Sequence, residues 1–395
     1  MGKEMDQVNG MPIIIGGMVL DIHATASVPS SSKSTTPGKI EYMHGGVARN
    51  VAECLFKLGT KLYMISAVGH DMAGDKLLEL WISARLPVEG ILQGSDIKTA
   101  VVCNMFDVDG ELTAGVASVE SIERCVTPQW IQGFKPIIRS APVMLVDANL
   151  SIEALNASCR MAADFGVPVW FEPVSVAKSK RVASVAKHVT FASPNEHELV
   201  AMAEALTHGN VFRPIQRDQN KNSCSIESLF KELKPAILVL LDGGIKFVLV
   251  TLGPQGAILC SRLEPTCLNE CLNSAKILGG RNELFEAVTG RCPTHRYTSS
   301  TLRKRGSHLF AMHFPALPAT VGRVSGAGDC LVGGVLASLC SGLSIMQSVA
   351  VGIAAAKAAL LVETNVPHQY DLTALADDAG AVYDAATVVF QESLL

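Results

Sequence analysis

The chain has 395 residues, of which 48% are hydrophobic, enough to bury the core of one large α/β domain or of two ordinary ones. Its formal net charge of −4 at pH 7 provides no broad basic field, which argues against a polymeric nucleic acid as a partner. The most apolar long stretch, residues 235–253, is interrupted by Asp242, two glycines and Lys246. It therefore fails as a membrane span, and we expect the end of a helix followed by a buried strand.

Cysteine content and the chain ends bear on the cellular compartment. The eleven cysteines are an odd number, and the first residues lack the charged and apolar regions of a secretory signal. This favours a reducing intracellular location with free thiols. The ending Ser393, Leu394, Leu395 shares the first and last letters of the peroxisomal Ser-Lys-Leu signal but lacks its central base. The sequence therefore allows either the cytoplasm or the peroxisome as the location.

Short apolar runs bounded by Gly, Pro or Asp alternate with helical patterns along most of the chain. The expected strands are residues 12–21, 61–69, 141–148, 167–173, 188–194 and 246–253. Between the first two, Val47, Val51, Leu55 and Leu58 recur at helical spacing before Gly59. Continuous apolar strands separated by helices predict an α/β fold with a mostly parallel sheet covered on both faces.

Two segments depart from this alternation. Residues 99–118 contain two extended runs around an Asp-Gly turn, which predicts a β hairpin that could form a flap over a cleft. Residues 260–306 are polar, basic and rich in Cys, Asn, Ser and Thr, and we interpret them as a surface insertion. The rest is expected to form one domain over residues 11–390.

The segment GRVSGAGDCLVGG, residues 322–334, places Gly326, Ala327 and Gly328 directly before Asp329 at the start of a helical pattern. Such a turn can direct several backbone N–H groups, together with the positive end of the helix dipole, toward an anion. Asp329 would repel a phosphate but could take a proton from a hydroxyl that attacks phosphorus. Together these features predict phosphoryl transfer to an alcohol; the alternative is that Asp329 merely caps the helix.

Two other nucleotide-binding patterns do not fit. The dinucleotide fingerprint needs a third glycine at position 331, where this chain has Leu331. The G-x-x-x-x-G-K-[ST] pattern of P-loop enzymes does not occur anywhere in the sequence. The sequence therefore supports neither a Rossmann dehydrogenase nor a P-loop enzyme.

A second glycine site, HGGVARN at residues 44–50, precedes the first helical pattern. Gly45 and Gly46 would let the backbone approach a ligand closely, and Asn50 offers the donor and acceptor that a sugar hydroxyl requires. Asp21, at the end of the first expected strand, could accept hydrogen bonds from two vicinal hydroxyls. The alternatives are a strand-end turn residue at Asp21 and a cap or turn residue at Asn50.

GGVARNVAECLFKLG, GHDMAG at residues 69–74 and SGAGDCLVGG together resemble the ribokinase-like carbohydrate kinases, also called the PfkB family, in order and spacing across nearly the whole chain. The resemblance implies a three-layer fold with a central mostly parallel sheet flanked by helices. It also implies a small β lid at about residues 22–44 and 97–118, which in relatives can form a dimer contact.

Within the family, GGV-x-RN before a helix is most similar to the pseudouridine kinases. This implies ATP-dependent phosphorylation of the 5′-hydroxyl of that nucleoside to give pseudouridine 5′-monophosphate. One alternative is another ribokinase-family sugar or nucleoside kinase, such as a ribokinase or an adenosine kinase. A catalytically silent nucleotide-binding protein is the other.

The resemblance also implies roles for the matching residues. Asp329 would be the general base, and the anion hole would be formed by the amides of Gly326, Ala327 and Gly328. Four residues would hold the ribose: Asp21, Gly45, Gly46 and Asn50. In the family, the N-x-x-E pattern is associated with phosphate and with Mg²⁺, which its glutamate holds through water. Asn195 and Glu198 match this pattern. Three residues would lie near ATP: Thr251, Gly253 and Gly256. Without the resemblance, Asn195 and Glu198 would be interpreted as a capping arrangement at a helix start.

Two positions depart from the family pattern. Many relatives carry an Asn two residues before the sugar-binding Asp, where this chain has Val19, which puts one ribose contact in doubt. Arg323 stands where many relatives have an Asp, in a loop that binds a monovalent cation in potassium-activated members. A guanidinium cannot ligate a cation, so activation by K⁺ is left open.

Overall fold

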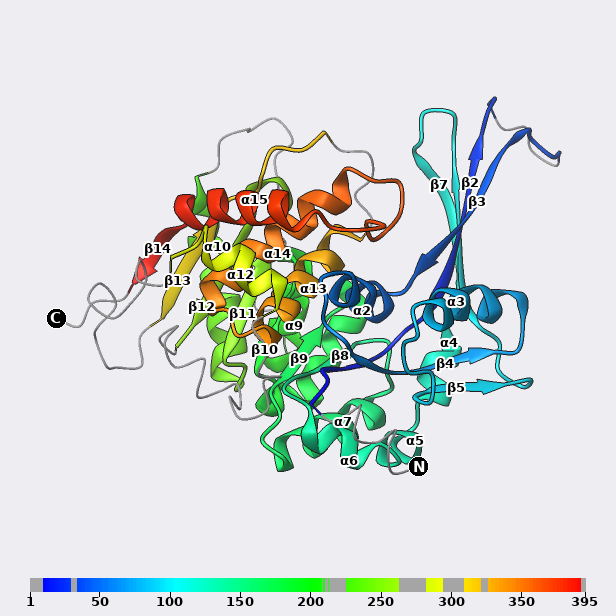
Figure 1. Cartoon of the computed structure of the whole chain (residues 1–395), viewed down its shortest axis with the longest axis horizontal. Helices are drawn as coiled ribbons and strands as arrows, with labels where there is room; N and C mark the ends of the chain where they lie inside the picture. Colours follow the sequence, from blue (N-terminus) through cyan, green and yellow to red (C-terminus); the bar gives the residue numbers. More distant parts are fainter. Residues whose placement is uncertain are drawn as a thin grey trace.

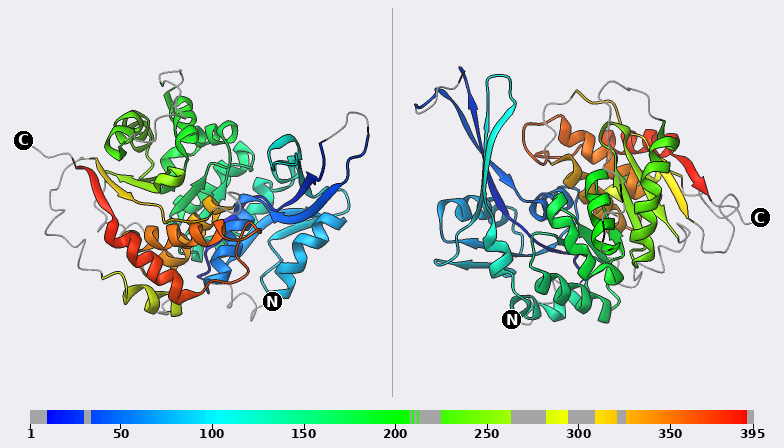
Figure 2. Two further views of the ribbon diagram at one scale, coloured as in Figure 1. Left: turned by 90° about the horizontal axis from the view of Figure 1, so that it is seen from above. Right: turned by 180° about the vertical axis from the view of Figure 1, so that it is seen from behind.

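The computed structural model describes residues 10–29, 34–207, 209, 212, 225–262, 282–293, 309–320 and 326–391. Most of the expected insertion at residues 260–306, Arg323 and the ending at residues 393–395 lie outside the described residues. A large sheet with helices on both faces forms the body, and a smaller sheet projects from it (Figures 1 and 2).

The large sheet has ten strands in the order β14-β13-β12-β11-β10-β9-β8-β1-β4-β5. Neighbours from β5 to β11 are parallel, and β12 to β14 extend the sheet antiparallel. Their bounds are β1 Ile13–Ile15, β4 Tyr63–Gly69, β5 Ile91–Gly94, β8 Met144–Asp147, β9 Val169–Glu172, β10 Phe191–Ala192, β11 Phe247–Thr251, β12 Ala257–Ser261, β13 Phe310–Phe314 and β14 Thr387–Gln391. The predicted mostly parallel sheet is confirmed.

The helices cover the two faces of this sheet and bury two apolar cores. One core joins the sheet to α2 Val47–Lys57, α3 Met72–Ser83, α12 Glu283–Thr289, α13 Ala327–Cys340, α14 Ile345–Leu360 and α15 Leu372–Ala385. The other joins it to α4 Glu120–Cys125, α5 Pro128–Gln132, α6 Lys135–Ser140, α7 Ile152–Asp164, α9 Glu196–Thr207 and α10 Ile226–Asp242. Successive strand residues alternate between the cores: Ile14 belongs to the first, Ile13 and Ile15 to the second.

The projecting sheet has four strands in the order β3-β2-β6-β7, with bounds β3 Gly38–Gly45, β2 Val19–Ala26, β6 Ala100–Phe106 and β7 Leu112–Ser118. The predicted hairpin is confirmed, because β6 and β7 pair antiparallel. These strands fall almost entirely within the two segments expected to form a lid. Figure 1 shows that the sheet extends away from the helical layers.

The first expected strand is two strands. β1 ends before Gly16, and the chain re-enters as β2 in the projecting sheet. At this break the backbone of Gly16 packs directly against the Asp147 side chain. A Cβ at Gly16 would lie 2.3 Å from the Asp147 carboxyl carbon. Asp21 is consequently the third residue of β2, and its predicted position at the end of a strand of the large sheet is wrong.

The carboxyl ends of the parallel strands meet at one edge of the large sheet, which is where ligands bind in open α/β folds. The projecting sheet rises from the same edge, since β2 continues the chain from β1. In the described ranges, no helix combines the length and apolar character needed to cross a membrane.

Candidate active site

The start of α13 is built on Gly326, which caps the helix with a φ of 83° in the left-handed region. A Cβ at this position would lie 2.1 Å from the carbonyl oxygen of Asn365. Only glycine satisfies both constraints without strain. The turn therefore brings the first amides of α13 and the Asp329 side chain to the edge of the sheet.

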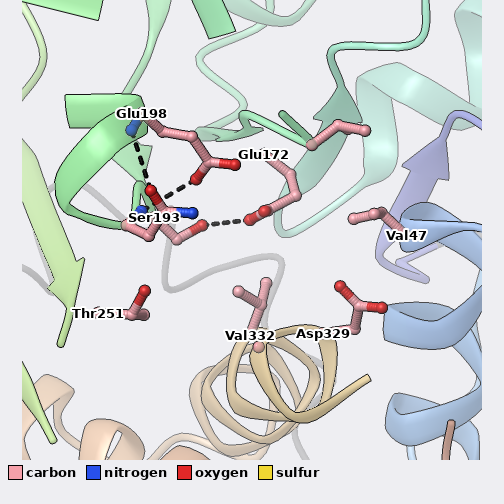
Figure 3. Close-up of a pocket in the computed structure, with 10 residues that line it drawn as sticks. Val47, Glu172, Ser193, Glu198, Thr251, Asp329 and Val332 are labelled. Carbon is pink, nitrogen blue, oxygen red and sulfur yellow. Dashed lines mark hydrogen bonds between the residues drawn. The ribbon is translucent and has the colours of Figure 1, made fainter. Parts of the chain in front are cut away.

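A cavity of about 170 Å³ lies at this helix start (Figure 3). It is lined by Val47, Glu172, Val174, Ser193, Asn195, Glu198, Thr251, Gly328, Asp329 and Val332. The lining comes from the ends of β9, β10 and β11 and from the starts of α2, α9 and α13. Among the described residues, three carboxyl groups and no lysine or arginine line the cavity. Such a site favours a cation or protonated carboxyls.

Asp329 is the carboxyl group nearest the helix start. The side-chain amide of Asn50 donates a 2.7 Å hydrogen bond from Nδ2 to Oδ2 of Asp329. Burial raises the pKa of Asp329 to about 6, against the opposing effects of this hydrogen bond and of Arg49, while the charges of Asp147 and Asp21 raise it further. A carboxylate with a pKa near 6 is ionised at neutral pH and remains basic enough to take a proton.

The amide of Asn50 is held from its other side by Arg49. The guanidinium donates from Nη1 to Oδ1 of Asn50 over 3.0 Å and forms an ion pair through Nη2 with Glu53. Arg49 is only 1% exposed. Burial lowers its pKa to about 9, opposed by the charges of Asp21 and Asp329, so it remains a cation at neutral pH.

The residues expected to hold a ribose come together around the start of α2. A Cβ at Gly45 would lie 2.0 Å from Oδ2 of Asp21, and one at Gly46 would lie 2.5 Å from the carbonyl oxygen of Gly17. The side chain of Asn365 donates to Oδ2 of Asp21 at 3.4 Å and to the carbonyl oxygen of His44 at 2.9 Å. This region is close enough to the cavity for the charge of Asp21 to raise the pKa of Asp329.

Asn195 and Glu198 form the capping box that the spacing predicts without any resemblance. The backbone N–H of Asn195 donates to Oε2 of Glu198, and the N–H of Glu198 donates to Oδ1 of Asn195, each over 2.9 Å. Both residues also line the cavity. Burial raises the pKa of Glu198, partly offset by the Asn195 N–H and by His197. Asn195 and Glu198 therefore cap the start of α9 and line the cavity at the same time.

Of the three residues expected near ATP, one lines the cavity and two lie in a neighbouring turn. Thr251, the last residue of β11, lines the cavity. Gly253 and Gly256 form the turn between β11 and β12, with φ values of 58° and 89°, and do not line it. A Cβ at Gly256 would lie 2.0 Å from the carbonyl oxygen of Phe314, so this glycine is required by the turn itself.

Glu172 completes the acidic wall of the cavity (Figure 3). Ser193 donates from Oγ to its carboxylate, and Trp170 donates from Nε1 to Oγ of Ser193 over 2.7 Å. Burial raises the pKa of Glu172 well above its ordinary value, and the charges of Asp329 and Glu198 add to this effect. Within the described residues, no group of three or more His, Cys, Asp or Glu side chains is arranged to hold a metal ion by itself.

Comparison with known proteins shows the family of this chain. The model of the pfkB family carbohydrate kinases matches residues 13–272. The chain belongs to this family.

Individual pfkB-family relatives agree over different lengths. The pseudouridine kinase of Arabidopsis thaliana is 49% identical over 378 residues, covering 96% of this chain and 98% of that protein. The pseudouridine kinase of Escherichia coli is 30% identical over 196 residues, covering 50% of this chain and 60% of that protein. Among solved structures, Arabidopsis thaliana ribokinase complexed with ribose and ATP superimposes with a TM-score of 0.66 at 17% identity, over 93% of this chain and 98% of that one. This last similarity shows the ribokinase-like fold.

Several polar residues of this pfkB-family site were not singled out from the sequence, among them Arg49, Glu172 and Asn365. Arg49 lies inside the GGVARN motif, and a Glu four residues later was a detectable sign of an ion pair on one helix face. Glu172 follows an apolar run, as strand-end carboxylates at ligand sites do. Asn365 had no such sign, since its contacts with Asp21 span 344 positions in the sequence.

Proposed function

We propose that this protein is an ATP-dependent kinase that transfers a phosphoryl group to the 5′-hydroxyl of pseudouridine and so forms pseudouridine 5′-monophosphate. The observation that carries the proposal is the Asp329 carboxylate, held by Asn50 at the start of α13 and facing the cavity. The substrate is proposed from the 49% identity to Arabidopsis pseudouridine kinase over nearly the full length of both chains.

The reaction requires a base and a positive environment for the phosphates. Asp329 takes the proton of the 5′-hydroxyl as its oxygen attacks the γ-phosphorus of ATP, and the bond to the bridging oxygen breaks to release ADP. The amides of Gly326, Ala327 and Gly328, at the positive end of α13, stabilise the charge on the transferring group. Base and anion site are adjacent because they share one helix start.

The nucleoside and ATP occupy opposite sides of this helix start in the proposal. Asp21, Gly45, Gly46 and Asn50 hold the ribose. ATP lies along Asn195, Glu198 and Thr251, with the turn containing Gly253 and Gly256 beyond them.

The acidic cavity fits a divalent cation. Glu172, Glu198 and Asp329 line it, and no lysine or arginine of the described part of the chain does. Mg²⁺ is usually bound by one or two carboxylates together with waters and substrate phosphates. Glu198 would hold Mg²⁺ through water. The ion, when bound, neutralises charge on the phosphates.

The projecting sheet acts as a lid over the nucleoside and excludes water as an acceptor of the phosphoryl group. Its two faces differ. The strand register places Ile40, Tyr42, Met105 and Val116 on the face opposite Asp21. These side chains are between 50% and 73% exposed. An apolar face of this kind fits the contact of a homodimer.

If this face joins two copies, charging it will separate them. We expect the wild type to be a dimer by light scattering at micromolar concentration and an Ile40→Asp/Val116→Asp double variant to be a monomer that still unfolds cooperatively. The matched control replaces Ile152, which is 50% exposed at the start of α7 on the body, with Asp. A monomeric wild type would contradict the dimer.

A panel of acceptors tests the proposed function. ADP formation is measured with pseudouridine, uridine, adenosine and ribose at fixed ATP and Mg²⁺, and the product is located by phosphorus NMR. We expect kcat/KM to be highest for pseudouridine. A preference for ribose or adenosine would replace the substrate but keep the reaction, whereas ATP binding without turnover of any acceptor would favour a silent nucleotide-binding protein.

The pH dependence follows from the pKa of Asp329. Because burial raises it to about 6 and the base must be ionised, kcat/KM is expected to rise tenfold per pH unit below about 6 and to level off above it. The measurement is kcat/KM for the nucleoside from pH 4.5 to 8.5 at saturating MgATP. A profile that is flat down to pH 5 would show that no group with this pKa acts as the base.

A further inference from the structure

Three charged side chains are buried in a row along α2. Arg49, Glu53 and Lys57 follow each other at four-residue spacing, and their side chains are between 2% and 12% exposed. Removing charges from water costs free energy that an ion pair only partly offsets. Apolar residues would pack this helix face against the core at a lower cost in free energy. We therefore expect the three charged side chains to have a role other than packing.

The row is a chain of hydrogen bonds that ends on the proposed base. Lys57 donates from Nζ to the carbonyl oxygen of Pro367 over 2.7 Å and pairs with Oε1 of Glu53 over 2.5 Å. Oε2 of Glu53 pairs with Nη2 of Arg49. The other guanidinium nitrogen, Nη1, donates to Oδ1 of Asn50. Nδ2 of Asn50 then donates to Oδ2 of Asp329.

The direction of these hydrogen bonds, from donor to acceptor, decides how the Asn50 amide is oriented. An asparagine side chain can present either its oxygen or its nitrogen, and the oxygen would repel the Asp329 carboxylate. A guanidinium is a donor only, so Arg49 can accept neither hydrogen of Asn50 and must face its oxygen. The nitrogen is thereby directed at Asp329. A lysine has no rigid fork with which to bind Asn50 and Glu53 at once.

We infer that Arg49 is a positioning residue for the phosphoryl transfer: it orients the Asn50 amide so that this amide holds the Asp329 carboxylate in place for taking the proton. The inference rests on the proposed function, because it assigns Asp329 the role of base. Glu53 and Lys57 fix Arg49 in turn and tie it to the loop that carries Pro367.

Charges from several elements act on Asp329. Arg49 of α2 lowers its pKa, and Asp147 at the end of β8 and Asp21 of β2 raise it. Glu172 of β9 also lies within electrostatic range. Arg49 is the cation among these groups, and it acts both by its charge and through the Asn50 hydrogen bond. Loss of Arg49 should therefore make Asp329 harder to ionise.

The test compares Arg49→Met with Arg49→Lys. For Arg49→Met we expect kcat to fall about tenfold and the acidic limb of the pH profile to move up by roughly one pH unit, as for loss of a nearby opposite charge. Arg49→Lys keeps the charge but not the fork, so its limb should return toward that of the wild type. The KM for ATP should stay unchanged in both. The control is Lys357→Met, which removes a partly buried cation paired with Asp378 between α14 and α15 and should leave the limb in place.

A second readout separates this inference from the proposed function. The ionisation of Asp329 is followed by carbon-13 NMR of its carboxyl group, assigned with Asp329→Asn, in the wild type and both Arg49 variants. An upward shift of its pKa in Arg49→Met, partly reversed in Arg49→Lys, supports the inference even if no acceptor is phosphorylated. An unchanged pKa and pH profile in a folded Arg49→Met protein overturns it. If Arg49→Met does not fold, a wild-type kcat in Arg49→Lys overturns it instead.

Discussion

Asp329→Asn should lower kcat by at least roughly two orders of magnitude, in the range lost when a general base is removed. The amide has the shape of the carboxylate but cannot take the proton of the attacking hydroxyl. Its oxygen can still accept the hydrogen bond that Asn50 donates over 2.7 Å in the wild type. Nucleoside and ATP affinities should therefore change little. The measurements are kcat from initial rates of ADP formation and dissociation constants from calorimetry.

The same substitution separates catalysis from folding. Burial raises the pKa of Asp329 in the folded chain to about 6, above that of an unfolded aspartate. The folded state therefore binds this proton more tightly, so stability falls as the pH rises from about 4, the pKa of an unfolded aspartate, to about 6, and the full cost of the ionised carboxylate persists above that pH. Asp329→Asn removes that cost, so its melting temperature at pH 7.5 should equal or exceed that of the wild type. Normal turnover would instead mean that Asp329 is not the base, and a lower melting temperature would attribute the lost activity to folding.

Much of the body was predictable because its strands are buried on both faces. A strand covered by helices on each side reads as a continuous apolar run, and all six expected runs contain strands of the large sheet. The first run, residues 12–21, predicted one strand where the structure has two. Val19 and Leu20 are as apolar as a continuation of β1 would be, but they start a different sheet after the turn at Gly16 and Gly17. Local pattern does not distinguish two sheets joined by a turn.

The candidate site was predictable where its residues follow each other in sequence. The Gly-Ala-Gly-Asp turn predicts a helix start with a carboxylate, and α13 begins there. The contacts between segments were not predictable. Asn50 and Asp329 are 279 positions apart, and the sequence contains no sign that the amide of Asn50 is held between Arg49 and the proposed base.

The two glycines of this turn have different physical reasons, which the sequence does not reveal. Gly326 has a left-handed φ and packs against the backbone of Asn365. Gly328 is within the first turn of α13, and a Cβ there would meet no described atom within 4 Å. It faces the cavity instead. The first glycine is therefore needed for the fold, and the second only for space beside the proposed phosphate site.

Gly326→Ala should consequently unfold at lower denaturant, with a free energy of unfolding reduced by roughly 2–4 kcal/mol from the strained φ and the clash of its Cβ with Asn365. Its kcat should fall as well, because relief of that clash shifts the start of α13 and Asp329 with it. The matched control, Gly328→Ala, should keep wild-type stability within about 0.5 kcal/mol, since alanine also favours helix. Its methyl group should raise only the KM for ATP. Urea unfolding and steady-state kinetics of both variants provide the comparison, and equal losses of stability would contradict this division of roles.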